Sequence, residues 1–210
     1  MNKQLAKLLL VLLTAPLCLC AQMVDSASVS RVTRLPGNEA LPAAALKTNL
    51  LTDLTGTFNL GVEFRLSNYL TMDLSANYNP WTFSDNRKLK HVLIQPELRY
   101  WVNEPFNGHF LGAHLSYTNF NVGNLNLPLK IFPDLKENRV QGNGYGAGVS
   151  YGYQWIFSPR WSKEASLGFG YMYLDYRRYE CRTCGKKLNK ESKHYFGPTK
   201  LAVSLIYIIK

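Results

Sequence analysis

Apolar and polar residues alternate one by one along most of this chain, and this period-two pattern is the feature that most limits its fold. Tyr145 and Trp155, for example, fall on one face of their segment, while Gly146 and Gln154 fall on the other. Alternation of this kind predicts β-strands with one apolar face. Six segments show it clearly and two more weakly, which predicts eight strands: residues 59–66, 69–78, 91–101, 145–155, 164–173 and 201–209, with 45–53 and 109–118 as the weaker pair.

The lengths of the strands and of their connections indicate how the strands are used. Strands of about nine to eleven residues suit a tilted membrane crossing. The connections alternate between short ones (67–68, 103–108 and 158–160) and longer ones (79–90, 119–144 and 175–196). Short turns at one end and long loops at the other are typical of outer-membrane barrels. We therefore predict an all-β, eight-stranded antiparallel up-and-down transmembrane β-barrel over residues 43–210, located in the cell outer membrane.

A soluble periplasmic barrel is the alternative that the alternation leaves open, because a lipocalin-like barrel shows the same pattern with its apolar face inward. The aromatic residues favour the membrane interpretation. Those on the apolar face lie near strand ends, as expected for two interfacial girdles: Tyr78, Tyr100, Tyr145, Trp155, Trp161 and Tyr173. The longest late apolar run, residues 201–209, is too short for a membrane helix, which needs about 20 residues.

The first 21 residues have the order of a secretory signal, with Lys3 and Lys7 before an apolar stretch and small residues near a cleavage point at Ala21. A lipoprotein signal is the rival interpretation, because Cys18 and Cys20 lie nearby. Residues 22–42 are turn-rich and are expected to form a flexible periplasmic lead.

The polar faces of the predicted strands carry balanced charge. An eight-stranded barrel has room inside only for side chains, so these residues predict an ion-paired lumen without an open pore. The predicted network contains Lys47, Asp53, Glu63, Arg65, Asp73, Glu97, Arg99, Glu164 and Lys200. Pro96 falls within a predicted strand and removes one ladder donor, which predicts a bulge or a shifted strand boundary there.

The formal net charge is +10, and a large part of the excess lies in residues 175–195. Seven bases of this segment form a predicted basic outer loop: Arg177, Arg178, Arg182, Lys186, Lys187, Lys190 and Lys193. Such a loop suits the phosphates of lipopolysaccharide or an acidic partner, and a merely solvated loop is the alternative. Nucleic acid is not an expected partner of an exported barrel.

Cys181 and Cys184 form a Cys-x-x-Cys pair in the same loop. Exported thiols usually oxidise, so a local disulfide is the leading interpretation. Metal binding is the alternative, with His194 as a third ligand, although structural zinc needs four. Free thiols remain a third option. No cofactor is predicted.

Several runs resemble a known family, the most distinctive being Asn79-Pro80-Trp81-Thr82-Phe83. The runs Lys47-Thr48-Asn49-Leu50-Leu51, Tyr151-Gly152-Tyr153-Gln154-Trp155 and Tyr195-Phe196-Gly197-Pro198-Thr199-Lys200 are similar to it as well. Together they look like an uncharacterised family of small exported proteins from Gram-negative anaerobes, defined only as a domain of unknown function. The resemblance implies an outer-membrane barrel, with an envelope or fimbrial protein as a partner, and carries over no catalytic residue.

The predicted role is structural or interactive at the cell envelope, with the chain not an enzyme. An outer-membrane enzyme acting on lipid or peptide at the outer rim is the alternative. Its candidate residues would be His91 or His114 with Asp73 and Ser75. A catalytic base needs its partner within hydrogen-bonding reach, which sequence spacing does not establish.

Overall fold

The computed structural model describes residues 42–83, 87–123, 139–179 and 187–209. Nearly all of these residues lie in strands, and a single turn of helix, α2 (Leu50–Asp53), interrupts the series. The strands are β1 (Ala44–Asn49), β2 (Phe58–Arg65), β3 (Leu70–Asn79), β4 (Thr82–Phe83), β5 (Arg87–Trp101), β6 (Gly108–Gly123), β7 (Arg139–Ile156), β8 (Trp161–Tyr179) and β9 (Lys187–Ile209).

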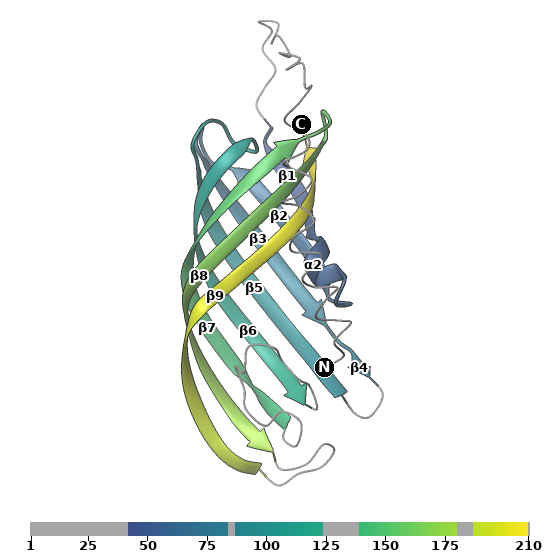
Figure 1. The fold of residues 1–210 in the computed structure, drawn as a ribbon, viewed down its shortest axis with the longest axis vertical. Helices are drawn as coiled ribbons and strands as arrows, with labels where there is room; N and C mark the ends of the chain where they lie inside the picture. Colours follow the sequence, from purple (N-terminus) through teal and green to yellow (C-terminus); the bar gives the residue numbers. More distant parts are fainter. Residues whose placement is uncertain (1–41, 84–86, 124–138, 180–186, 210) are drawn as a thin grey trace, which may run out of the picture. The chain divides into compact units, whose positions relative to one another are not determined.

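Eight of these strands form one antiparallel ring, counted over the described residues (Figure 1). Each strand pairs with the next in sequence, β3 pairs directly with β5, and β1 pairs with β9 to close the circle. The two-residue β4 is a small addition that pairs with the start of β5. The prediction of an all-β, up-and-down arrangement of eight antiparallel strands is confirmed.

Residues that alternate between apolar and polar in the sequence alternate between exposed and buried in the structure. Successive side chains of a strand point to opposite faces. Along β6, Gly108, Phe110, Gly112 and His114 are buried in turn, and the residues between them are exposed. The apolar face of most strands is the exposed one, so most of the large apolar side chains of the ring point outward and most of its polar side chains point inward.

Four hairpin strands continue well past their predicted ends. β7 begins at Arg139 and β8 runs to Tyr179, while β9 begins at Lys187, so the predicted loop over residues 175–195 is largely a β-hairpin. Likewise, β6 and β7 remain paired as far as Gly123 and Arg139. The apolar alternation ends earlier because the outward side chains of these extensions are polar, and hydrophobic periodicity therefore cannot reveal them.

β1 is shorter than predicted, because the chain turns into α2 after Asn49 instead of continuing to Asp53. The side chain of Asn49 caps the helix by accepting a hydrogen bond from Leu51 N. The same side chain binds the backbone of β9, donating to Leu201 O and accepting from Val203 N, both at 3.2 Å. Asn49 therefore ends β1 and fastens that end to β9.

Pro96 causes neither a bulge nor a strand boundary. β5 passes through it, and the pairing of β5 with β6 has the same register on both sides, at Ile94↔Tyr117 and Glu97↔His114. The ladder lacks the pairs between these two points, as expected where proline has no N–H to donate. The Gln95 side chain spans the interruption by donating to Ser116 Oγ at 2.8 Å.

Candidate functional site

The centre of the ring is organised around one guanidinium. Arg99 Nη1 lies 2.8 Å from Glu164 and 3.0 Å from Glu63, and Nη2 lies 2.8 Å from Asp73. Its Nε is 3.3 Å from Glu97. The side chains involved are at most 2% exposed. A single arginine on β5 thus contacts carboxylates from β2, β3, β5 and β8.

Two lysines complete this central cluster. Lys47 on β1 pairs with Glu63 and lies 3.4 Å from both Asp73 and Glu164. Lys200 on β9 pairs with Glu97 and lies 3.8 Å from Asp73. Three buried cations therefore face four buried carboxylates, and buried charges persist only when they are paired in this way.

Two glycines leave room for the cluster. A methyl group on Gly61 would overlap the Lys47 side chain, and one on Gly112 would overlap Glu97 and Ser150. Glycine at these inward positions is therefore part of how the ring holds large charged side chains.

The central cluster contains seven of the nine residues predicted for the lumen network, and the structure places the other two elsewhere. Asp53 is exposed on α2, where it accepts a hydrogen bond from Thr48 Oγ1 at 2.6 Å. Arg65 is half-buried at the last residue of β2. The premature end of β1 explains the first difference, and the position of Arg65 at the edge of the ring explains the second.

Apolar side chains lie on both sides of the central cluster. On the side of the short turns, Trp101, Phe106 and Phe110 are at most 1% exposed, and the Phe110 ring lies 4.3 Å from the Arg99 guanidinium. The Trp101 indole donates to Thr71 Oγ1, which in turn donates to Glu63. On the other side a second buried group fills the ring: Phe120, Val122, Val140, Leu174 and Tyr176. Charges in the middle are thus enclosed between two apolar layers.

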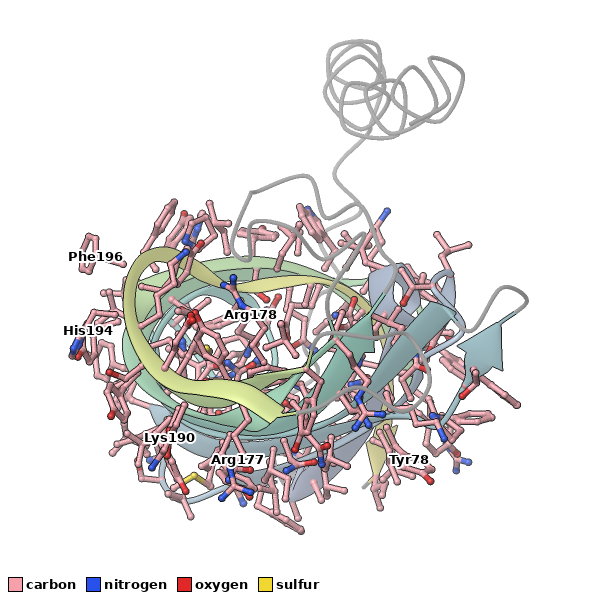
Figure 2. The ribbon with its side chains drawn as sticks, turned by 90° about the horizontal axis from the view of Figure 1, so that it is seen from below. Tyr78, Arg177, Arg178, Lys190, His194 and Phe196 are labelled. Carbon is pink, nitrogen blue, oxygen red and sulfur yellow. The ribbon has the colours of Figure 1, made fainter. Side chains whose placement is uncertain are left out.

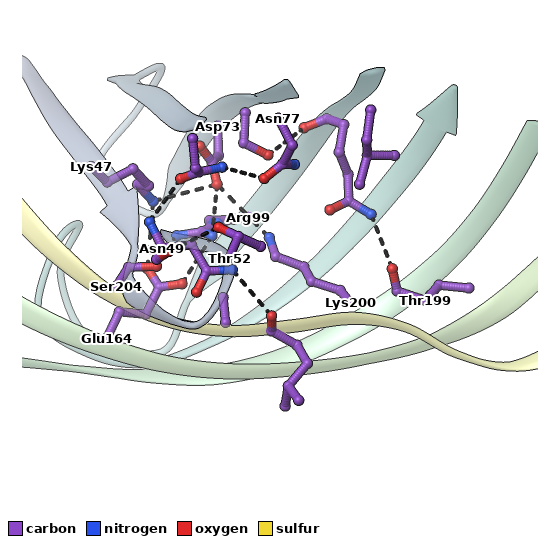
Figure 3. Close-up of a pocket in the computed structure, with 16 residues that line it drawn as sticks. Lys47, Asn49, Thr52, Asp73, Asn77, Arg99, Glu164, Thr199, Lys200 and Ser204 are labelled. Atoms are coloured by element: carbon purple, nitrogen blue, oxygen red, sulfur yellow. Dashed lines mark hydrogen bonds and ion pairs between the residues drawn. The ribbon is translucent and has the colours of Figure 1, made fainter. Parts of the chain in front are cut away.

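A small polar cavity of about 90 Å³ adjoins the central cluster (Figure 3). Its walls include Asp73, Lys200 and the amides of Asn59, Asn77 and Gln95. Asp73 Oδ1 is buried and has no hydrogen-bond partner among the described residues. A cavity of this size with polar walls has room for a few water molecules.

The four residues considered for catalysis have other partners. His91 Nδ1 lies 3.4 Å from Leu89 O, and His114 Nε2 lies 2.9 Å from Thr199 Oγ1. Ser75 donates to the carbonyl of Gln95 at 3.3 Å. Asp73 belongs to the central cluster. These contacts do not bring a histidine, Asp73 and Ser75 together.

The outward face of the ring carries an apolar band. Val149, Leu115 and Leu201 are 67%, 62% and 55% exposed, and many similar side chains surround them. At the long-loop end the band stops at a row of paired residues, Tyr117↔Tyr145, Tyr145↔Tyr173 and Tyr173↔His194. At the short-turn end it stops at a second aromatic group: Tyr69, Tyr100, Trp155, Trp161 and Tyr207.

The predicted basic outer loop is divided between the two faces of the β8–β9 hairpin (Figure 2). Arg177 and Lys190 are exposed and point outward. Arg178 points into the ring, where it lies 3.3 Å from Glu191, and Lys193 is half-buried. Lys187 is a strand residue paired with Tyr179. Arg182 and Lys186 lie outside the described residues.

The proposed thiol site also falls mostly outside the described residues, since these omit both Cys181 and Cys184. His194, the third metal ligand considered, lies on the outside of β9 with Nδ1 hydrogen-bonded to the Tyr171 hydroxyl. Within the described ranges, no three His, Cys, Asp or Glu side chains are grouped as a metal site would require.

The chain matches a family model described as a protein of unknown function, DUF3575, over residues 13–209. The chain belongs to the DUF3575 family. The resemblance inferred from the Asn-Pro-Trp-Thr-Phe run and its companions is thereby confirmed at the level of an uncharacterised family. No protein with a curated description matches this DUF3575 chain. Across the described parts of the chain, the one helix is far too short to span a bilayer.

Sequence reasoning about this DUF3575 protein missed the apolar layer beside Arg99. Trp101 lies two residues after Arg99 on the same strand and therefore shares its face, so strand parity alone would have placed the indole inside. Phe106 could not be found in this way, because it lies in the turn between β5 and β6 and reaches the interior from there.

Proposed function

We propose that this DUF3575 protein is an exported outer-membrane β-barrel whose interior is closed, with a structural or interaction role at the cell envelope. The observation that carries the proposal is the apolar band on the outward face, bounded at both ends by aromatic side chains. A water-soluble barrel buries its apolar face, whereas a membrane barrel turns it outward toward lipid.

The height of the band supports a bilayer as its surroundings. Tyr145 and Trp155 border it on β7 and are ten residues apart. Ten strand residues measure about 33 Å. At the usual strand tilt of about 40° this length spans roughly 25 Å, the height of the apolar band in outer-membrane barrels.

The filled interior supports a role other than transport. Arg99 and its four carboxylates occupy the middle of the ring, with buried aromatic and aliphatic side chains on either side. A solute would have to displace this packed layer of charge. The cavity beside Asp73 is no larger than a few water molecules and does not provide a path.

The loop end of the barrel is the natural place for interactions, because outer-membrane barrels turn their longer loops outward. An envelope or fimbrial protein at this end is therefore the protein partner that we propose. A catalytic role is not part of the proposal, since His91 and His114 bind main-chain and threonine oxygens instead of Asp73 or Ser75.

The decisive test is outer-membrane fractionation of the full chain, followed by gel migration with and without boiling. We expect the protein in the outer-membrane fraction, with unboiled protein migrating differently from boiled protein. Recovery in the soluble periplasm would overturn the proposal. Liposomes containing the folded protein should not swell in small sugars, and swelling at the rate given by a porin would exclude the closed interior.

A further inference from the structure

The outward face of the ring beyond the aromatic row carries a second, basic row. The register aligns Lys90↔Asn121, Asn121↔Gln141, Gln141↔Arg177 and Arg177↔Lys190 across five neighbouring strands, β5 to β9. The side chains in this basic row are three cations and two amides. No carboxylate interrupts it, although it joins strands that are far apart in the sequence.

The cations of the basic row are incompletely neutralised. Lys190 Nζ lies 3.1 Å from Asp175, but Arg177 and Lys90 form no ion pair with any residue that the structure describes. Arg177 and Lys190 are direct cross-strand neighbours, and like charges in that position destabilise a sheet. On the opposite face of the same hairpin, Arg178 is matched by Glu191.

The basic row lies next to an aromatic row on the same outward face. The aromatic row Tyr117–Tyr145–Tyr173–His194 runs parallel to it on β6 to β9, four residues nearer the apolar band on each of these strands. Aromatic rows mark the headgroup level of a bilayer. Long arginine and lysine side chains just outside that level reach back to it with their charged ends.

We propose that the basic row binds the phosphate groups of a phosphorylated glycolipid in the outer leaflet of the membrane. The guanidinium of Arg177 and the ammonium groups of Lys90 and Lys190 suit phosphate oxygens. The exposed amide of Gln141 suits the hydroxyl groups of the attached sugars. A bound phosphate between Arg177 and Lys190 removes the repulsion that their pairing creates. This inference rests on the proposed membrane location and names the lipid that the barrel recognises there.

The test measures binding of purified lipid A that carries both phosphates to the detergent-folded full chain. The test variant combines Arg177→Gln and Lys190→Gln. The matched control combines Arg160→Gln and Lys163→Gln, which removes two exposed bases at the short-turn end. We expect the test variant to bind about 25-fold more weakly, because each base near an anionic surface contributes roughly a fivefold factor. The control should bind like the unmodified chain.

Two further measurements separate the lipid from other sources of phosphate. Lipid A treated with phosphatase should bind as weakly as the test variant binds intact lipid A. Inorganic phosphate at equal concentration should not displace the lipid. Equal binding of intact and dephosphorylated lipid would overturn the inference, and so would equal losses of binding in the test and control variants. Displacement of the lipid by inorganic phosphate would also overturn it, because the row would then bind the free ion.

All variants are first checked for the heat-dependent gel shift, so that loss of the barrel is distinguished from loss of lipid binding.

Discussion

Arg99 Nη1 on β5 and Glu164 Oε2 on β8 lie 2.8 Å apart across the interior of the ring. Two strands, β6 and β7, lie between β5 and β8 in the sequence, so this contact joins parts of the ring that are not direct neighbours. Glu164 is also within 3.4 Å of Lys47 on β1. One carboxylate therefore connects three strands that share no direct backbone pairing with one another.

Replacing Arg99 with methionine should destabilise the protein strongly. The substitution removes the guanidinium and leaves four carboxylates to share two lysines in a buried space. Breaking a buried ion pair by removing one partner costs about 3–5 kcal/mol. Urea unfolding of the detergent-folded protein, followed by gel shift, measures the loss. Arg65→Met is the control, since Arg65 lies outside the central cluster, and equal effects of the two variants would contradict this role of Arg99.

Enlarging Gly112 should prevent the central cluster from forming. The side chain of Gly112→Val would occupy space that Glu97 and Ser150 now fill. Overpacking of a filled interior typically costs about 1–3 kcal/mol. The next residue offers the control, because Ala113 is exposed on the opposite face and Ala113→Val adds a similar volume there. A lower urea midpoint for the first variant alone is expected, and equal midpoints would refute the explanation.

A charge within the apolar band should be costly only if lipid surrounds the barrel. Val149 lies between the two aromatic levels and is 67% exposed, so Val149→Lys changes no buried contact of note. In a membrane, lysine near the middle of such a band costs about 2–4 kcal/mol. Gln141→Lys, outside the aromatic row, should cost far less. Unfolding from lipid vesicles measures both, and a neutral Val149→Lys would argue for a water-exposed face.

If the chain is exported as proposed, it should carry a disulfide between Cys181 and Cys184. The prediction rests on the sequence, because exported thiols tend to oxidise. The intact mass measured without reductant should be lower by two hydrogens than after reduction. An unchanged mass would exclude the disulfide, and a mass increase matching a metal ion in native conditions would favour the metal alternative.

Most of the strands and their order could be predicted from the sequence, because a sheet with one apolar and one polar face requires apolar and polar residues to alternate along each strand. Periodicity did not reveal the far ends of β7, β8 and β9, because the outward side chains there are polar and the hydrophobic alternation of the sequence ends. The end of β1 was missed for another reason. Leu50 and Leu51 continue an apolar pattern, but the side chain of Asn49 favours a helix cap, which is a local hydrogen-bonding effect that periodicity does not record.

The interior was easier to predict than the outer face. Lys47, Glu63 and Arg99 could be assigned to one side by strand parity alone, and the structure brings them within salt-bridge distance. The basic row could not be found in this way, because it depends on the register between strands. Lys90 and Arg177 lie far apart in the sequence, and only the paired ladders place them in one row across the sheet.

The shortness of β1 has a consequence for the order of assembly. β1 joins β9 through six residue pairs, and the two strands lie at opposite ends of the folded chain. Contacts between distant segments form late, because the entropy of closing the intervening loop must first be overcome. We therefore expect the hairpins from β2 to β9 to form first and the pairing of β1 with β9 to form last. The hydrogen bonds from the Asn49 side chain to the backbone of β9 would then stabilise this final pairing. Under mechanical load, β1 and β9 should be the first pair of strands to separate.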